Sequence, residues 1–400
     1  MENFTFFNPT RIEFGADKEQ LIGQHLARHG VRKVLLCYGS ERIKRDGLFD
    51  VVTQRLAEQG IAFVELGGIV SNPLLSTVRE GIALARAQQV DAILSVGGGS
   101  VLDSVKAIAA GVAYAGDVWD LFTSKARIEA ALPVFAILTL AATGSEMNCS
   151  AVVTNDETQE KFFITAPAVF PRLSIVNPRL MQSVSREYLV YSAADVIAHS
   201  IEAYFTATVH PRLQSRLVEA VINTIIETTE TLLANPADDD ARGEFAWAAT
   251  LALNGLTFSG CAGFGYPNHA IEHSLSALFN VPHGAGLSVV MPAWMKWYQS
   301  RNPAQFERFA RQVFGLATAA EGIAALEAWF DKIGTPTRLG QLGIQAADLP
   351  PIAANVQLSV QRFGIAEAYP PARLIVGAVA LIAILYALLR LVRAGIPGMP

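Results

Sequence analysis

The chain has 400 residues, 51% of them hydrophobic and 17% charged, with a formal net charge of −5. This composition excludes a disordered chain, and the absence of a dense Lys/Arg block argues against a nucleic-acid partner. Cys37, Cys149 and Cys261 share no CxxC spacing, so we expect no disulfide framework and a reducing compartment. Residues 1–15 do not read as a signal peptide, and we expect a cytoplasmic protein.

Strand-like apolar runs alternate with helical patterns in the first part of the chain. We predict strands at 34–38, 62–66, 92–96 and 134–140, and helices at 48–59, 73–89 and 101–110. This alternation predicts an α/β domain with a mainly parallel sheet, in which ligands bind at the carboxyl ends of the strands.

Long helical patterns replace the short strands after about residue 178. We predict helices at 187–205, 213–233, 240–256 and 304–317. The chain therefore divides into an α/β domain at 1–185, an all-helical domain at 186–370 and a tail at 371–400.

Residues 374–389 of the tail are sixteen uncharged, mostly apolar residues in a row. A membrane-spanning helix needs about 20 such residues, so the run falls short of that length. We expect a buried terminal helix or a helix in a subunit interface. Membrane contact through residues 374–392 is the less favoured alternative.

A glycine-rich turn, residues 97–100 (GGGS), follows a predicted strand and opens a helix. Glycines let the backbone approach a phosphate, and the N-terminus of the helix favours an anion, so the turn predicts phosphate binding. A tight strand-to-helix corner is the alternative. Residues 139–146 (TLAATGSE) also follow a strand and suit a loop lining the same cleft. Taken alone, that segment reads better as a helix N-cap, and Asn72-Pro73 is equally ambiguous.

Two pairs of polar residues, each four positions apart, lie in helical stretches of the second part. They are Asp195 with His199 and His269 with His273, and the members of each pair share one helix face. His283 follows in VPHGAG, where proline and glycine suggest a turn. The chain has seven histidines, and four of them belong to this arrangement.

Three imidazoles and one carboxylate form a ligand set that suits Fe²⁺ or Zn²⁺ better than Mg²⁺ or Ca²⁺. The spacing does not decide which histidine is not a ligand, and a further histidine beside the metal would suit proton transfer. The alternative is that the two pairs only mark solvated helix faces. Among the other histidines, we expect His25 and His29 on an exposed early helix and His210 in a loop.

Four motifs together carry a family resemblance: GGGSVLDSVKAIAA, TLAATGSE, AADVIAHSIEAY and HAIEHSLSALFNVPHG. From about residue 5 to about residue 365, the chain resembles the iron-containing (group III) alcohol dehydrogenases, in the branch of NADPH-dependent aldehyde reductases and butanol dehydrogenases. The resemblance implies a dinucleotide-binding α/β domain and a helical metal-binding domain with the active site between them. It also implies hydride transfer between NAD(P)H and small or medium aldehydes or primary alcohols, and a homodimer or larger assembly. The apolar tail departs from the family pattern.

The resemblance also implies individual roles. The metal ligands would be Asp195, His199, His269 and His283, with His273 as the additional, catalytic histidine near the substrate. The cofactor would be bound by Gly39, Ser40, Asn72, Gly97, Gly98, Gly99, Ser100, Asp103, Thr139, Thr143 and Lys161.

The residues after the first predicted strand bear on the choice of cofactor. Some NAD-preferring members carry an Asp where this chain has Gly39, and Lys44 and Arg45 are close behind. A missing carboxylate and a nearby cation both favour the 2′-phosphate, so we expect NADP(H) over NAD(H), although Glu41 opposes this.

Two other functions fit the same scaffold. A glycerol dehydrogenase-like or dehydroquinate synthase-like enzyme is one, but the latter needs several basic residues for its substrate. The predicted metal residues have apolar neighbours instead: Ala193, Val196, Ile197, Phe264, Tyr266 and Leu278. The other is a non-catalytic, membrane-tethered nucleotide-binding protein, which would have no need of a complete ligand set.

Overall fold

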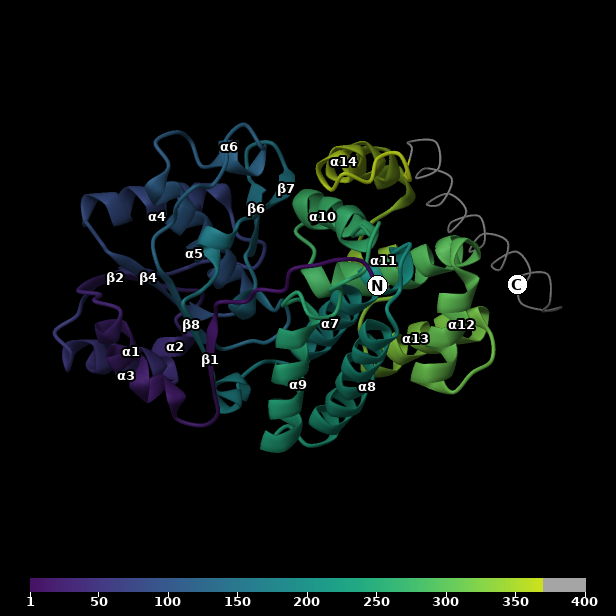
Figure 1. Ribbon diagram of the computed structural model, residues 1–400, viewed down its shortest axis with the longest axis horizontal. Helices are drawn as coiled ribbons and strands as arrows, with labels where there is room; N and C mark the ends of the chain where they lie inside the picture. The colour runs from purple at the N-terminus through teal and green to yellow at the C-terminus, as the bar shows by residue number, and fades with distance from the viewer. Residues whose placement is uncertain (370–400) are drawn as a thin grey trace, which may run out of the picture.

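Six parallel strands form one sheet, in the order β1-β8-β5-β4-β2-β3. The sheet lies in the N-terminal part of the molecule (Figure 1). The computed structural model describes residues 1–369. The strands are β1 (Arg11–Phe14), β2 (Lys33–Tyr38), β3 (Ala62–Leu66), β4 (Ala92–Gly97), β5 (Val134–Leu138) and β8 (Leu173–Val176). The central strands are continuously apolar because helices cover both faces of the sheet.

Two pairs of helices cover the two faces of the sheet. They are α4 (Leu75–Ala87) with α5 (Gly99–Ala113), and α1 (Ile22–Arg28) with α3 (Leu48–Ala57). Leu35 and Cys37 of β2 belong to the buried cluster under the first pair, whereas Val34 and Leu36 belong to the cluster under the second. This alternation along one strand divides the core of the domain between the two faces.

The strand order creates a crevice at the carboxyl ends of β2 and β4. These strands are neighbours, but the chain leaves β2 toward β3 and leaves β4 toward β5, which lies on the opposite side. Loops that diverge in this way leave a crevice, which is where open α/β sheets bind their ligands. The loop after β2 begins at Gly39, and the glycine-rich turn ends β4 and opens α5.

An antiparallel hairpin of β6 (Ser150–Asn155) and β7 (Glu160–Thr165) was not predicted from the sequence. It packs beside α5 and the helical part and carries Lys161 toward the crevice. The short helices α2 (Arg42–Arg45) and α6 (Trp119–Phe122) complete this domain. The helix predicted from residue 73 begins at Leu75, because Leu74 is extended and forms a parallel bridge to Thr154.

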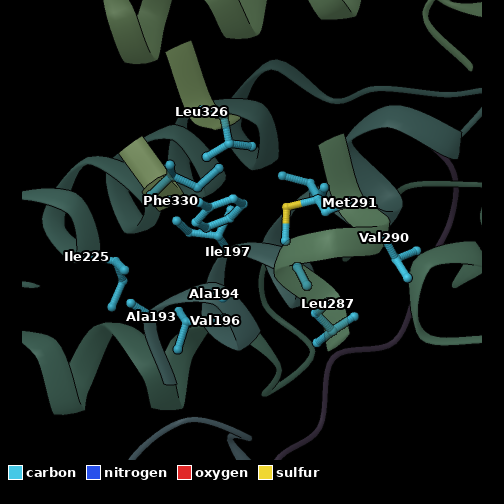
Figure 2. Packing of buried hydrophobic residues seen from close by; sticks show 14 of the residues in the cluster. Ala193, Ala194, Val196, Ile197, Ile225, Leu287, Val290, Met291, Leu326 and Phe330 are labelled. Carbon is cyan, nitrogen blue, oxygen red and sulfur yellow. The ribbon is translucent and has the colours of Figure 1, made fainter. Parts of the chain in front are cut away.

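Helices make up the second part of the molecule. They are α7 (Arg186–Thr206), α8 (Arg212–Ala234), α9 (Asp239–Ala252), α10 (Pro267–Phe279), α11 (His283–Tyr298), α12 (Pro303–Phe314), α13 (Ala319–Ile333) and α14 (Leu349–Arg362). Buried α7 lies at their centre, and Figure 2 shows members of its apolar cluster: Ala193, Ala194, Val196, Ile197, Ile225, Leu287, Val290, Met291, Leu326 and Phe330. The predicted fold class is therefore confirmed.

Three local predictions were wrong. The helix expected at 240–256 ends at Ala252, and the turn expected at His283 is the first turn of α11. His25 is buried rather than exposed, because it lies on the buried face of α1 together with Ile22 and Leu26. The division at residue 185 falls just before α7 and stays a prediction, since the N-terminal segment also reaches the helical part through Glu2 N–H and Gly260 O at 3.0 Å.

No single helix among residues 1–369 is both long and apolar enough to span a membrane. Helices α12 and α13 meet those criteria only as a pair, with a bend of 48° between them. The apolar run at 374–389, and with it the predicted terminal helix and the alternative of membrane contact, lies outside the described residues.

Candidate active site

Three helices bring one carboxylate and three imidazoles together. Asp195 and His199 lie one turn apart on α7, His269 lies on α10, and His283 opens α11. Oδ1 of Asp195 is 3.5 Å from Nε2 of His199, 3.9 Å from Nε2 of His269 and 3.6 Å from Nε2 of His283. The four predicted ligands thus point their donor atoms at one small volume.

The spacing of these atoms fits a metal ion. Two ligands about 2.1 Å from a tetrahedral centre lie about 3.4 Å apart, close to the observed separations. Oδ1 of Asp195 and Nε2 of His269 are also buried and have no hydrogen-bond partner among the described residues. Buried polar atoms normally find a partner, so this donor set suits a divalent cation.

Two buried glutamates orient two of these histidines, and neither was predicted. Glu202 of α7 accepts from Nδ1 of His269 at 2.8 Å, and Glu272 of α10 accepts from Nδ1 of His283. A hydrogen bond at Nδ1 fixes the tautomer that leaves the Nε2 lone pair for a metal. Each glutamate follows a predicted ligand by three residues, so a carboxylate on an apolar helix face was the signal available in the sequence.

Burial and the neighbouring carboxylates set the charges of this cluster. Burial alone would raise the pKa of Asp195, but His199, His283 and His269 outweigh it and lower that pKa. Burial lowers the pKa of His199 to about 4. Burial also opposes a charge on His269, yet the nearby carboxylates of Asp195 and Glu202 raise its pKa to about 9. His269 is therefore the imidazole that holds a proton near neutral pH before a metal binds.

His273 lies beside this cluster, with its ring centroid 5.7 Å from that of His283. Its Nδ1 is 3.2 Å from the carbonyl oxygen of Lys161, and its ring centroid is 5.3 Å from that of Phe363. Burial, followed by the charge of Lys161, holds the pKa of His273 well below its usual range. The ring is therefore neutral, with its proton on Nδ1 and an acceptor at Nε2.

A cleft of about 1020 Å³ runs from the end of β2 to the histidine cluster. All the residues predicted for the site line it: Gly39, Ser40, Asn72, Gly97, Gly98, Gly99, Ser100, Asp103, Thr139, Thr143, Lys161, Asp195, His199, His269, His273 and His283. Arg42, Tyr188, Leu253 and Asn280 also line it and were not predicted. The α/β part and the helical part of the molecule thus both line one cleft.

The glycine-rich turn leaves backbone N–H groups free at the start of α5. Gly98 is the N-cap in an extended conformation, and no side chain caps the helix. A Cβ on Gly99 would lie 2.4 Å from Cγ2 of Thr143, and one on Gly98 would lie 3.1 Å from Cβ of Leu140. Only glycines let the turn of residues 97–100 pack this closely against the loop that follows β5. The free N–H groups and the dipole of α5 suit an anion.

Buried polar contacts stabilise the loop between β5 and β6. Lys106 Nζ donates to Ser145 Oγ at 2.8 Å, to Asn148 O at 2.9 Å, to Asn148 Oδ1 at 3.0 Å and to Ser150 O at 2.9 Å. Burial lowers the pKa of Lys106 to about 8. Asp103 accepts from Ser145 Oγ at 2.6 Å and from Val152 N–H at 3.0 Å. Asp103 therefore lines the cleft with both of its oxygens already engaged by the protein.

The charges near Gly39 are largely paired. Lys44 Nζ is 2.5 Å from Glu65 Oε1 and 3.3 Å from Glu41 Oε2. Arg42 lines the cleft, and its Nη1 donates to Ser183 O at 3.0 Å. Nε of Arg42 is also 3.8 Å from Oδ2 of Asp46. Arg42 lines the cleft and Lys44 does not, so Arg42 is the cation presented to the cleft at this end.

Two family models match adjoining parts of the chain. The model described as iron-containing alcohol dehydrogenase matches residues 9–178, and the model described as Fe-containing alcohol dehydrogenase family, C-terminal, matches residues 189–366. A Bacillus subtilis protein named probable NADH-dependent butanol dehydrogenase 1 is 40% identical over 361 residues, covering 88% of this chain and 93% of that protein.

Two further relatives differ in the cofactor that they are named for. The NADPH-dependent aldehyde reductase YqhD of Escherichia coli is 31% identical over 366 residues, covering 89% of this chain and 93% of that protein. The crystal structure of NADH-dependent butanol dehydrogenase A from Thermotoga maritima superposes with a TM-score of 0.89 at 45% identity, covering 91% of this chain and 92% of that one.

Proposed function

Because the chain belongs to the iron-containing alcohol dehydrogenase family, we propose that Asp195, His199, His269 and His283 hold its catalytic metal. The protein is an NAD(P)H-dependent alcohol dehydrogenase and aldehyde reductase that uses iron or a similar divalent metal. One observation carries the ligand assignment: Oδ1 of Asp195 faces three Nε2 atoms at 3.5 to 3.9 Å.

Each domain takes one part of the reaction in this proposal. Residues 1–185 bind the dinucleotide and residues 186–370 hold the metal. The pyrophosphate binds at the turn of residues 97–100, supported by the free N–H groups at the start of α5. Asn72, Thr139, Thr143 and Lys161 line the cleft between that turn and the metal ligands.

Reduction of an aldehyde adds a hydride to the carbonyl carbon and a proton to its oxygen. When bound, the metal supplies Lewis-acid polarisation of the carbonyl group and the nicotinamide supplies the hydride. His273 handles the proton: with Nδ1 held by Lys161 O, its Nε2 takes up a proton or, once protonated, delivers one.

The lining of the cleft supports a small or medium uncharged aldehyde as the substrate. Arg42 and Lys161 are the only lysine or arginine residues among its described lining residues, and Lys161 Nζ is held by Asn72 Oδ1 at 2.9 Å. A dehydroquinate synthase-like reaction needs more basic residues for its charged substrate. Since close relatives are named butanol dehydrogenases, we propose butanal and similar aldehydes.

We propose NADP(H) as the preferred cofactor. Gly39 places no carboxylate at the end of β2, and Arg42 lines the cleft next to Ser40. Lys44 does not contribute as expected, because Glu65 and Glu41 hold its ammonium group. The test is kcat/KM with NADPH and with NADH: the ratio should favour NADPH and fall in Arg42→Gln. A wild-type preference for NADH would contradict the proposal.

We also propose that the protein is a homodimer or larger homo-oligomer. β1 is an edge strand of the sheet, and exposed Phe14 on it lies 6.0 Å from Trp247, measured between ring centroids. An unpaired edge beside exposed aromatic side chains suits a second copy. Light scattering should give at least twice the monomer mass of 43.0 kDa, and a monomer at micromolar concentration would contradict this.

The ligand assignment is tested by comparing His269→Ala with His29→Ala, an exposed histidine at the end of α1. His269→Ala should lose the bound metal and the NADPH-dependent reduction of butanal together, whereas His29→Ala should keep both. Retention of metal and rate by His269→Ala would overturn the assignment.

A further inference from the structure

Glu272 connects a predicted metal ligand with a lysine of the cofactor cleft. Its carboxylate is fully buried. Oε2 accepts from Nδ1 of His283 and lies 4.0 Å from Nζ of Lys161, while Oε1 accepts from Oγ of Ser276. One carboxylate thus meets an imidazole, an ammonium group and a hydroxyl.

The contacts continue from Lys161 to the wall of the cleft. Lys161 Nζ donates to Oδ1 of Asn72 at 2.9 Å. The amide of Asn72 in turn donates to Oδ1 of Asn280 and to the carbonyl oxygen of Val281, both at 3.1 Å. Asn72 and Lys161 both line the cleft, so the contacts run without a break from the α/β domain to His283.

The backbone of α11 leaves space for this carboxylate. A Cβ on Gly286 would lie 2.6 Å from Oε1 of Glu272 and 2.7 Å from its Cγ. Glycine is a poor helix former, yet here it allows α11 to pack directly on the side chain of Glu272.

Glu272, His273 and His283 also offer ligand atoms within 4.8 Å of one another, a spacing that a metal could use. The ammonium group of Lys161 already stands beside the carboxylate at that place. A second divalent cation would have to sit against this positive charge. Glu272 is therefore better suited to hold His283 than to bind a metal of its own.

We propose that Glu272 is a positioning residue that fixes His283 as an Nε2 ligand. The positive charge of Lys161 partly neutralises the carboxylate of Glu272 and so reduces its effect on His283. The inference rests on the proposed metal site. An anionic acceptor at Nδ1 both orients an imidazole and strengthens it as a ligand. Loss of this charge should weaken metal binding, whereas loss of the lysine charge should not.

The two substitutions give effects of opposite sign. In metal-stripped protein titrated with Co²⁺, Glu272→Gln should lower the affinity by about 10- to 100-fold and change the visible absorption of bound Co²⁺. Lys161→Gln should bind Co²⁺ at least as tightly as wild type, because it removes a nearby positive charge. Ser276→Ala is the matched control: it removes a hydrogen bond to the same carboxylate but leaves the charge, so its affinity should stay within about threefold.

Affinity and spectrum of Glu272→Gln both equal to wild type would overturn the inference. Equal weakening in Glu272→Gln and Lys161→Gln would also overturn it, since that result indicates only a structural role. If Glu272→Gln does not fold, Gly286→Ala decides the question, because its Cβ displaces the carboxylate without removing the charge; unchanged Co²⁺ affinity would then contradict the inference. Failure of the metal site itself is recognised separately, as absence of stoichiometric Co²⁺ binding to the wild-type protein or as full binding to Asp195→Ala.

Discussion

Glu202 on α7 accepts the Nδ1 proton of His269 on α10 at 2.8 Å, and the opposite ring nitrogen of His269 therefore faces Asp195. The same carboxylate accepts the backbone N–H of His269 at 3.0 Å and the side-chain amide of Asn268 at 3.0 Å. His269 thus lies between two carboxylates, one at each ring nitrogen, which accounts for its raised pKa.

Metal uptake should release a proton at neutral pH. The pKa of His269 is raised to about 9, so at pH 7 its Nε2 carries a proton that a metal must displace. Apparent affinity should therefore rise about tenfold per pH unit as pH approaches 9 and then level off. Calorimetry of Zn²⁺ binding at pH 7, in two buffers of different ionisation enthalpy, should give about one proton released per metal.

Glu202→Gln is the comparison for this prediction. Removing the carboxylate lowers the pKa of His269, so fewer protons should be released at pH 7. Heats that do not depend on the buffer in the wild-type protein would show that His269 carries no proton before the metal binds.

Gly99→Ala should weaken dinucleotide binding and leave metal binding intact. The added Cβ would lie 2.4 Å from Thr143, so the glycine-rich turn or the adjoining loop must shift. We expect the cofactor Kd to rise about tenfold, or about 1.4 kcal/mol, in a fluorescence titration with NADPH. Gly340→Ala is the matched control because its Cβ meets nothing within 4 Å. An unchanged Kd in Gly99→Ala would argue against this turn as the pyrophosphate site.

His273→Ala should keep the metal and lose rate. A positioned proton-transfer group contributes about 10²- to 10⁴-fold, so kcat for butanal reduction should fall by that order. The metal content of the purified protein should match wild type, and the pH profile of kcat should change its shape. Loss of metal from His273→Ala would instead make His273 a ligand.

Lys106→Met should destabilise the protein. The buried ammonium group donates to the backbone carbonyl oxygens of Asn148 and Ser150, and methionine would leave these two acceptors without that donor. Each such group costs about 1–3 kcal/mol, so we expect the free energy of unfolding to fall by about 3 kcal/mol in a urea titration. Lys125→Met, at a side chain that is 72% exposed, is the control and should change little. Equal stability of the two variants would show that the loop does not depend on Lys106.

The sequence predicted the central sheet well because its strands are buried on both faces. Continuous apolar runs such as residues 34–38 and 92–96 can be recognised as buried strands without knowing which strands they pair with. β1 and β8 were not predicted because each is only four residues long. In addition, β1 is half exposed at the edge of the sheet. His283 was expected in a turn because it stands between Pro282 and Gly284. A Cβ on Gly284 would lie 2.0 Å from the carbonyl oxygen of Tyr191, so glycine serves close helix packing there.

The candidate site was predictable where its residues repeat along one helix. Asp195 and His199 are four positions apart, and that spacing places them on one face of α7. Glu202 and Glu272 were not predicted because each accepts a hydrogen bond from a histidine of a different helix. Glu202 accepts from His269 of α10, and Glu272 accepts from His283 at the start of α11. Such pairs depend on how α7, α10 and α11 pack, which local spacing does not encode.

One metal, held by Asp195 and the three histidines, should be required for aldehyde reduction. The most direct test titrates Fe²⁺ anaerobically into metal-stripped protein while NADPH-dependent reduction of butanal is followed. Activity should be absent at the start and should rise to a plateau at one metal per chain. Full activity in the metal-free protein would show that the reaction needs no metal at this site.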